Sequence, residues 1–146
     1  MGSTAGADAS QGTTGAGRLG FAAGHVVQEF GYGEDVDAEL RAGIEEATGA
    51  PLEDEGYDDV IDGVVLWWRS SDGDVTDLTD ALVDARAALD DGGLVWLFTP
   101  KPGRPGIVEH GEIEEAATTA GLHATSTLAL APDWLGTRLG TRSRGR

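Results

Sequence analysis

Two stretches decide the fold, GVVLWW at residues 63–68 and LVWLF at residues 94–98. Each is a run of apolar residues without polar alternation, which is typical of a strand buried on both faces of a sheet. Between them, residues 75–89 place apolar side chains at helical spacing after Asp74, a helix-capping residue, and Gly92 and Gly93 are expected to end this helix. A strand, a helix and a strand in this order predict a parallel pair joined by a right-handed crossover.

The flanking segments extend the pattern in both directions. Residues 25–30 predict a first strand, and Asp35 is expected to cap a helix that ends at Gly49. Later segments predict one helix and two strands, at residues 112–120, 122–130 and 134–139. The order predicts an α/β fold: a single truncated Rossmann-like domain with a mainly parallel sheet of about five strands and an antiparallel edge strand.

Composition excludes several classes of protein. The 146 residues include 26 acidic and 10 basic side chains, for a net charge of −16. Nucleic-acid binding needs clustered cations, and a membrane span needs about 20 apolar residues in a row, so neither partner is expected. The absence of cysteine from the sequence excludes disulfides, zinc thiolate sites and thiol catalysis.

The ends of the chain differ from its middle. Residues 1–17 are rich in Gly, Ala, Ser and Thr, which predicts a disordered tail, and residues 141–146 predict a flexible basic tail. The single α/β domain is expected to span residues 18–140. The start of the chain lacks the basic and apolar pattern of a signal peptide, so we expect a cytoplasmic protein.

From Asp62 onward the sequence resembles the second half of a Rossmann-like methyltransferase. The run EFGYG at residues 29–33 is similar to the first half of the cofactor-binding turn of those enzymes. This resemblance implies cofactor-binding roles for Glu29, Gly31 and Gly33 toward S-adenosylmethionine or a related nucleotide. Residues 34–62 are too few for the two strands and helices that such enzymes place there, and the third glycine is replaced by Asp35. The alternative is a plain glycine turn between strand and helix.

Residues 19–139 resemble an actinobacterial family known only as domain of unknown function 3052. The strings that carry the resemblance are VVQE at 26–29, LWWR at 66–69, WL.TPK.GR at 96–104 and DW.GTRL at 133–139. This resemblance implies a cytoplasmic protein of a GC-rich bacterium. It brings no established activity and no catalytic residues.

The loop TPKPGRPG at residues 99–106 follows the carboxyl end of a central strand, where open α/β sheets hold ligands. Lys101 and Arg104 form a cationic spot there, and Trp134 and Arg138 are expected to approach it from the last strand. These four residues predict a site for a small anionic ligand. The alternative is that the cations only offset nearby acids.

Most acidic residues lie between Glu29 and Asp91. The acids at 72–80 do not form a calcium loop, because Asp77 and Val83 occupy the positions that need glycine and glutamate, and the histidines have no metal-ligand spacing. No metal site is therefore expected. The acids around 53–62 fit a docking surface for a basic protein partner, a solvated surface, or a pair of catalytic carboxylates.

No complete catalytic motif is present in the sequence, neither a G-x-S-x-G elbow nor a phosphate-binding Walker loop. The first hypothesis is therefore a non-catalytic binding or regulatory module. The alternative is a degenerate methyltransferase-like domain that binds S-adenosylmethionine or a related nucleotide. A small enzyme that uses Lys101 together with an acid is the third hypothesis.

Overall fold

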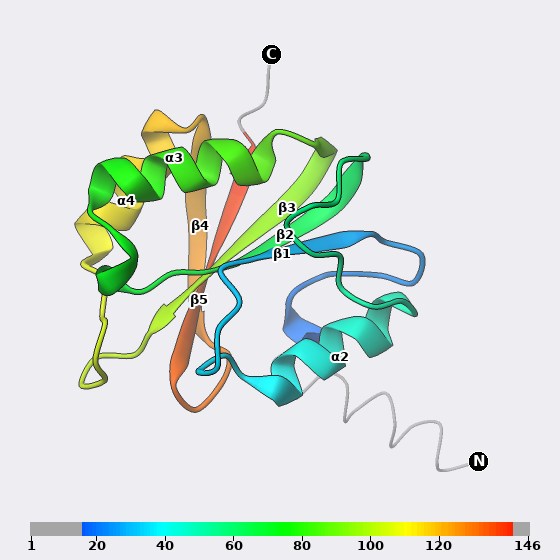
Figure 1. The fold of residues 1–146 in the computed structure, drawn as a ribbon, viewed down its shortest axis with the longest axis horizontal. Coiled ribbons are helices and arrows are strands. Elements are labelled where there is room, and N and C mark those ends of the chain that lie inside the picture. The colour runs from blue at the N-terminus through cyan, green and yellow to red at the C-terminus, as the bar shows by residue number, and fades with distance from the viewer. Residues whose placement is uncertain (1–15, 142–146) are drawn as a thin grey trace.

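The computed structural model describes residues 16–141 and contains one five-stranded sheet in the order β1-β2-β3-β5-β4 (Figure 1). The strands are β1 (Val27–Phe30), β2 (Ile61–Trp67), β3 (Leu89–Pro100), β4 (Leu122–Ala129) and β5 (Trp134–Thr141). β1, β2 and β3 pair in parallel, and β5 is antiparallel to both β3 and β4. The predicted fold class is confirmed, with the antiparallel pair at one side of the sheet and β4 outermost.

Helices cover both faces of the sheet (Figure 1). They are α2 (Ala38–Thr48), α3 (Val75–Arg86) and α4 (His110–Thr119), with short 3-10 turns η1 (Ala16–Arg18) and η2 (Ser70–Asp72). Alternate strand residues point to opposite faces, so Leu66 packs in the core under α3 and α4 and Trp67 packs in the core near α2. Trp67 and Trp96 are fully buried, as the apolar strands predicted.

The second predicted helix begins as expected but ends earlier. The Asp74 carboxylate accepts a hydrogen bond from the Asp77 amide, and the Asp77 carboxylate accepts one from the Asp74 amide. The prediction that this helix continues to Gly92 and Gly93 is wrong, because α3 ends at Arg86 and both glycines lie in β3. Leu89 pairs with Ile61 of β2 in the parallel ladder, and this long-range pairing outweighs the helical spacing of the sequence.

The cap of α2 is also corrected. Asp37, and not Asp35, caps the helix, since its Oδ1 accepts a hydrogen bond from the Leu40 amide at 2.8 Å. Gly49 ends the helix in a left-handed conformation, as expected. Asp35 is therefore left for a different role in the turn after β1.

A short segment after α2 covers the outer edge of β1. The Glu53 amide donates to the Val27 carbonyl at 2.9 Å, and the Glu53 carbonyl accepts from the Glu29 amide at 2.8 Å. These bonds form an isolated parallel bridge between Gln28 and Glu53. The segment therefore acts as a rudimentary sixth strand beside β1.

The expectations for the two tails fall mainly outside the described residues. Residues 16 and 17 lie in η1 and residue 141 ends β5, while residues 1–15 and 142–146 are not described. None of the helices within residues 16–141 is long and apolar enough to cross a membrane.

Candidate functional site

The turn after β1 begins at a buried carboxylate. Glu29 is 6% exposed and forms a two-point ion pair with Arg41, with Nε–Oε2 at 2.6 Å and Nη2–Oε1 at 2.8 Å. Its Oε2 also accepts the indole N–H of Trp67 at 2.9 Å. The Glu29 carboxylate is thus used inside the protein, where it ties α2 to β2.

Gly31 occupies a position that no other residue fits. Its φ is +77°, and a Cβ atom added there would lie 2.2 Å from the Trp67 carbonyl oxygen. Its amide donates to Glu55 Oε2 at 2.8 Å, and its carbonyl accepts from Arg69 Nη1 at 2.8 Å. Both backbone polar groups of Gly31 are therefore bound within the chain.

Arg69 organises the turn, although no sequence motif assigned it a role. Its Nε donates to Asp35 Oδ2 at 2.9 Å and its Nη2 bonds Asp35 Oδ1, so the two side chains form a fork. Nη1 also reaches the Trp67 carbonyl and Asp72, both at 3.3 Å. The hydrogen bond from Arg69 lowers the pKa of Asp35, and the same bond raises the pKa of Arg69. An arginine directly after a buried strand was the available sequence signal.

The structure separates two of the glycines that the methyltransferase resemblance groups together. Gly31 lines a groove on the α3 face of the sheet, whereas Gly33 lines a shallow polar hollow of about 550 Å³ with Tyr32 and Arg69. The turn thus takes part in two separate cavities. It does not form one open cradle.

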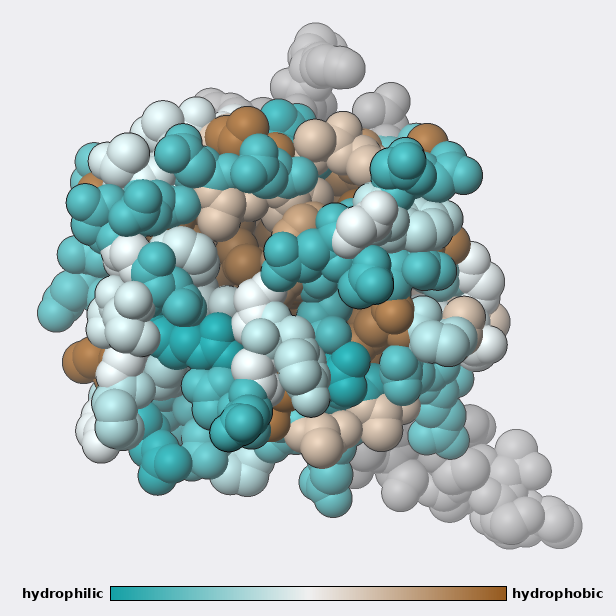
Figure 2. All heavy atoms as spheres, in the orientation of Figure 1, coloured by the Kyte–Doolittle hydropathy of each residue, from teal (hydrophilic) through white to brown (hydrophobic). Residues whose placement is uncertain are grey.

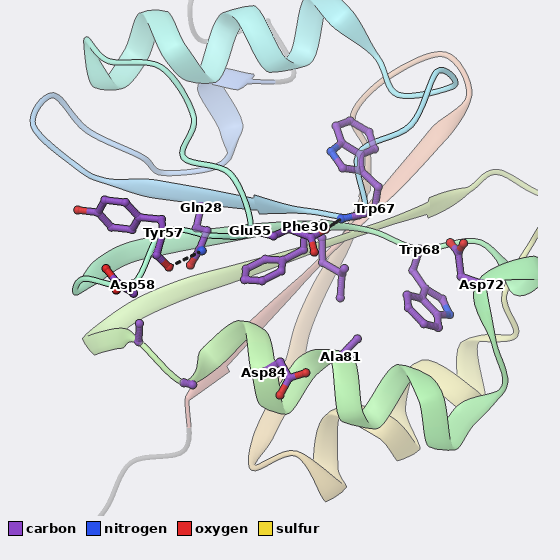
Figure 3. A pocket seen from close by; sticks show the side chains of 14 residues that line it. Gln28, Phe30, Glu55, Tyr57, Asp58, Trp67, Trp68, Asp72, Ala81 and Asp84 are labelled. Carbon is purple, nitrogen blue, oxygen red and sulfur yellow. Dashed lines mark hydrogen bonds between the residues drawn. The ribbon is translucent and has the colours of Figure 1, made fainter.

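The groove has a volume of about 660 Å³ and lies between β1, β2 and α3. Figure 3 shows Phe30 and Trp68 pointing from the strands toward α3, where Ala81 and Asp84 face them. Both aromatic side chains are only half-buried. α3 packs against β2, β3 and α4, and no helix among the described residues covers β1 on this face. The groove is the part of this sheet face, beside α3, that no described helix covers.

Carboxylates surround this apolar floor. Glu55, Asp58, Asp72 and Asp84 line the groove, and none of the described residues that line it is a lysine or an arginine. Partial burial and then the carboxylates of Asp59 and Glu53 raise the pKa of the Tyr57 phenol. Figure 2 shows one face of the molecule, on which apolar residues lie near the middle with hydrophilic residues around them. The groove is therefore an apolar surface in a negative potential.

Hydrogen bonds hold the outer wall of the groove in place. Gln28 is buried in β1, and its Nε2 donates to the carbonyls of Asp54 at 2.9 Å and Tyr57 at 3.0 Å. This side chain fixes the rudimentary strand and its carboxylates beside β1 (Figure 3).

Within residues 16–141, no three His, Asp or Glu side chains are grouped to hold a metal ion.

The predicted cationic loop has a different arrangement. Arg104 pairs with Asp133 at 3.3 Å, and the Lys101 amide donates to the Asp133 carbonyl at 3.0 Å. Trp134 is 3% exposed, and its indole N–H donates to the Asp35 carbonyl at 3.1 Å. The structure thus brings Lys101, Arg104 and Trp134 to one end of the sheet, but the Trp134 ring faces the core and packs against Trp67 at 4.9 Å.

Arg138 does not join this loop. It pairs with Trp96 in the β3–β5 ladder, four positions along β5 from Trp134, a separation of about 13 Å. Its side chain is exposed on the sheet. Binding of a small anion by Lys101 and Arg104 stays a prediction.

Residues 16–143 match a family model described as "Protein of unknown function (DUF3052)". The chain belongs to this family. It is 49% identical over 122 residues to uncharacterised proteins of Mycobacterium tuberculosis and Mycobacterium bovis, and the match covers 84% of this chain and 75% of each relative. The DUF3052 resemblance expected from the sequence is confirmed.

Solved structures show the same fold at low sequence identity. The pyocyanin biosynthetic protein PhzM matches with a TM-score of 0.64 at 14% identity, over 86% of this chain and 52% of that one. The mitomycin 7-O-methyltransferase MmcR matches with 0.62 at 13%, over 92% and 54%. A TehB-like SAM-dependent methyltransferase of Corynebacterium glutamicum matches with 0.52 at 15%, over 89% of both chains. This DUF3052 chain therefore has a methyltransferase-like, Rossmann-like fold, and it spans about half the length of the first two proteins.

Proposed function

We propose that this DUF3052 chain is a non-catalytic binding module whose groove receives a basic, amphipathic helical segment of a partner protein. One observation carries the proposal: the half-buried rings of Phe30 and Trp68 lie on an uncovered sheet face and are surrounded by carboxylates. An apolar surface of this kind inside a polar rim is the usual form of a protein-binding groove.

The shape of the groove favours a helix. In an α/β sheet each strand face is normally covered by a helix, and α3 leaves β1 without one in the described part of the chain. Ala81 of α3 and Ala88, just after that helix, line the groove, and such small side chains allow a second helix to approach to about 8–10 Å. A helix from a partner would lie beside α3 and cover Phe30.

The charge of the groove favours a basic segment. Asp58 and Asp84 are exposed and have no cationic partner among the described residues. Lysine or arginine side chains that flank the apolar face of the segment would pair with them. Such pairs fix orientation and speed association more than they add affinity, so binding should weaken as salt rises.

The turn supports a non-catalytic role. Arg69 and Glu55 occupy the backbone groups of Gly31, and Glu29 is bound to Arg41 and Trp67. Glu29 and Gly31, two of the three residues that the methyltransferase resemblance assigns to a cofactor, are thus already engaged within the chain. A cofactor would have to break these bonds.

The second candidate function is binding of an adenosyl compound in the same groove. Glu55 on the rudimentary strand lies beside Gly31, which supplies a carboxylate next to the turn, and the aromatic floor can stack a purine. The negative potential suits the sulfonium cation of S-adenosylmethionine and opposes nucleotide phosphates. This alternative predicts stabilisation of the protein by S-adenosylmethionine.

The test is a titration with a synthetic amphipathic helical peptide that has a leucine face and lysine flanks. We expect the peptide to change the fluorescence of Trp68, and we expect Asp84→Lys to weaken binding about tenfold, because an attraction becomes a repulsion. Glu46→Lys is the matched control, since it makes the same charge change on an exposed position of α2, on the other face of the sheet. Equal affinity for the two variants, or no binding to the wild type, would overturn the proposal.

The same preparation separates the second candidate. A thermal-shift measurement with S-adenosylmethionine at about 100 times its dissociation constant would show stabilisation equivalent to about 2.7 kcal/mol if the adenosyl alternative holds. Stabilisation by S-adenosylmethionine without peptide binding would replace the first proposal by the second.

A further inference from the structure

β4 is the outermost strand on one side of the sheet, and its outer edge has no strand partner within residues 16–141. The opposite edge differs, since Glu53 covers β1 with two backbone hydrogen bonds. An edge strand presents a row of unpaired N–H and C=O groups, which is a template for pairing with another chain. The sheet therefore has one protected edge and one open edge.

The open edge lacks the usual protection by charge. Between residues 116 and 132 the sequence contains no Asp, Glu, Lys or Arg, although a quarter of the chain is charged. All of β4 lies inside this uncharged segment, and Thr125, Ser126 and Thr127 are exposed along it. Edge strands that stay monomeric commonly carry charged residues or proline, and β4 has neither.

The charge of the whole chain singles out this edge for contact between identical copies. Two chains of net charge −16 repel each other over most of their surfaces. The repulsion is smallest where both copies present the uncharged segment. Arg138, exposed on β5 and level with Ser126 of β4 in the ladder, adds a positive charge beside it.

We propose that two copies of this chain pair through β4 about a two-fold axis, so that the two sheets form one continuous sheet whose two β4 strands are antiparallel to each other. A two-fold axis normal to the sheet makes the facing β4 strands antiparallel, and each contact between two residues then occurs twice in the interface. The ladder with β5 is irregular between Ala124 and Ser126, so the regular stretch from Ser126 to Ala129 is the part that forms the new ladder.

The first test is the mass of the full chain by sedimentation equilibrium. We expect a dimer that dissociates in Thr127→Lys, because two like charges face each other at the axis, and that persists in Thr76→Lys, the same change at an exposed position of α3. Circular dichroism confirms that each variant is folded. A monomeric wild type, or a dimer unaffected by Thr127→Lys, would overturn the proposal.

The second test uses the absence of cysteine from the sequence. Ser126→Cys gives the protein a single thiol on β4, and Ser71→Cys gives it a single exposed thiol in η2. With a short bifunctional maleimide, we expect cross-linked dimer from Ser126→Cys and little from Ser71→Cys. Equal yields from both would indicate random collision and contradict the β4 interface.

The salt dependence of dimerisation through β4 should differ from that of peptide binding in the groove. Screening reduces the repulsion between two acidic copies, so dimerisation should strengthen as salt rises, whereas binding of a basic segment should weaken. A dimer that dissociates at high salt would contradict contact through the uncharged edge.

Discussion

Arg69, two residues after the end of β2, donates two hydrogen bonds to the carboxylate of Asp35, in the turn after β1. Its third nitrogen reaches the Gly31 carbonyl at 2.8 Å. The guanidinium also lies 5.3 Å from the centre of the Trp134 ring, whose N–H bonds the Asp35 carbonyl. One side chain thus joins the ends of three strands and holds the glycine turn closed.

Removal of Arg69 should destabilise the protein. We expect Arg69→Ala to lower the free energy of unfolding by about 2–3 kcal/mol, because several charge-assisted hydrogen bonds are lost at a largely buried side chain. Arg69→Lys should lose most of the same energy, since an ammonium cannot form the fork. Urea unfolding measures both. Arg104→Ala, which removes a half-exposed cation paired with Asp133, should cost less than about 1 kcal/mol. Equal losses of unfolding free energy in Arg69→Ala and Arg104→Ala would contradict the conclusion that Arg69 holds the turn closed.

The Asp35–Arg69 pair should contribute to acid sensitivity. The pKa of Asp35 is lowered from 3.8 by the hydrogen bond from Arg69. A lowered pKa in the folded state gives stability that is present above the unfolded pKa and is lost as pH falls through the folded pKa. We expect Asp35→Asn to be less stable than the wild type at neutral pH, with the difference shrinking below about pH 4. A difference independent of pH in thermal unfolding would rule out this linkage.

Gly31→Ala should be more damaging than Gly49→Ala. Both glycines have positive φ, near +77° and +84°, so each substitution carries a backbone cost of about 1–2 kcal/mol. Gly49 has open space for a Cβ atom, whereas a Cβ atom added at Gly31 would overlap the Trp67 carbonyl. We expect Gly31→Ala to cost at least about 3 kcal/mol in chemical unfolding, since overpacking adds to the backbone strain. Similar losses of stability in Gly31→Ala and Gly49→Ala would contradict this expectation, because they would mean that the backbone around Gly31 shifts to make room for the added methyl group.

Glu29→Gln tests whether the buried carboxylate is structural. The substitution keeps the shape but leaves Arg41 without its charged partner, and we expect a loss of about 3 kcal/mol. The fluorescence of Trp67 should shift as well, because its indole N–H bonds this carboxylate. A Glu29→Gln variant with unchanged stability and unchanged fluorescence would contradict a structural role and would leave Glu29 available to bind a ligand.

Local sequence patterns were sufficient for the sheet and most helices. The apolar runs that contain Leu66 and Leu97 predicted the two central strands, and Asp74 and Gly49 marked helix ends correctly. The end of α3 could not be read locally, since the pairing of Leu89 with Ile61 depends on a strand far away in the chain. At Leu89 the local sequence favours a helix, but pairing with β2 places the residue in a strand.

The candidate site depended more on tertiary structure. Glu29 and Gly31 were singled out from a motif, but their partners Arg41, Glu55 and Arg69 come from three other segments. The groove exists because no described helix lies over β1, and a pattern of residues present in the sequence does not reveal a surface left uncovered. Trp134 and Arg138 are close in sequence, yet strand geometry holds them apart.

The most direct test of the central claim is amide NMR of the full chain during addition of the lysine-flanked amphipathic peptide. We expect shifts concentrated at Phe30, Trp68 and the groove side of α3 around Ala81 and Asp84, and we expect these shifts to be smaller at high salt and in Asp84→Lys. Shifts confined to other surfaces, or a spectrum that the peptide leaves unchanged, would contradict the assignment of this groove as the binding site.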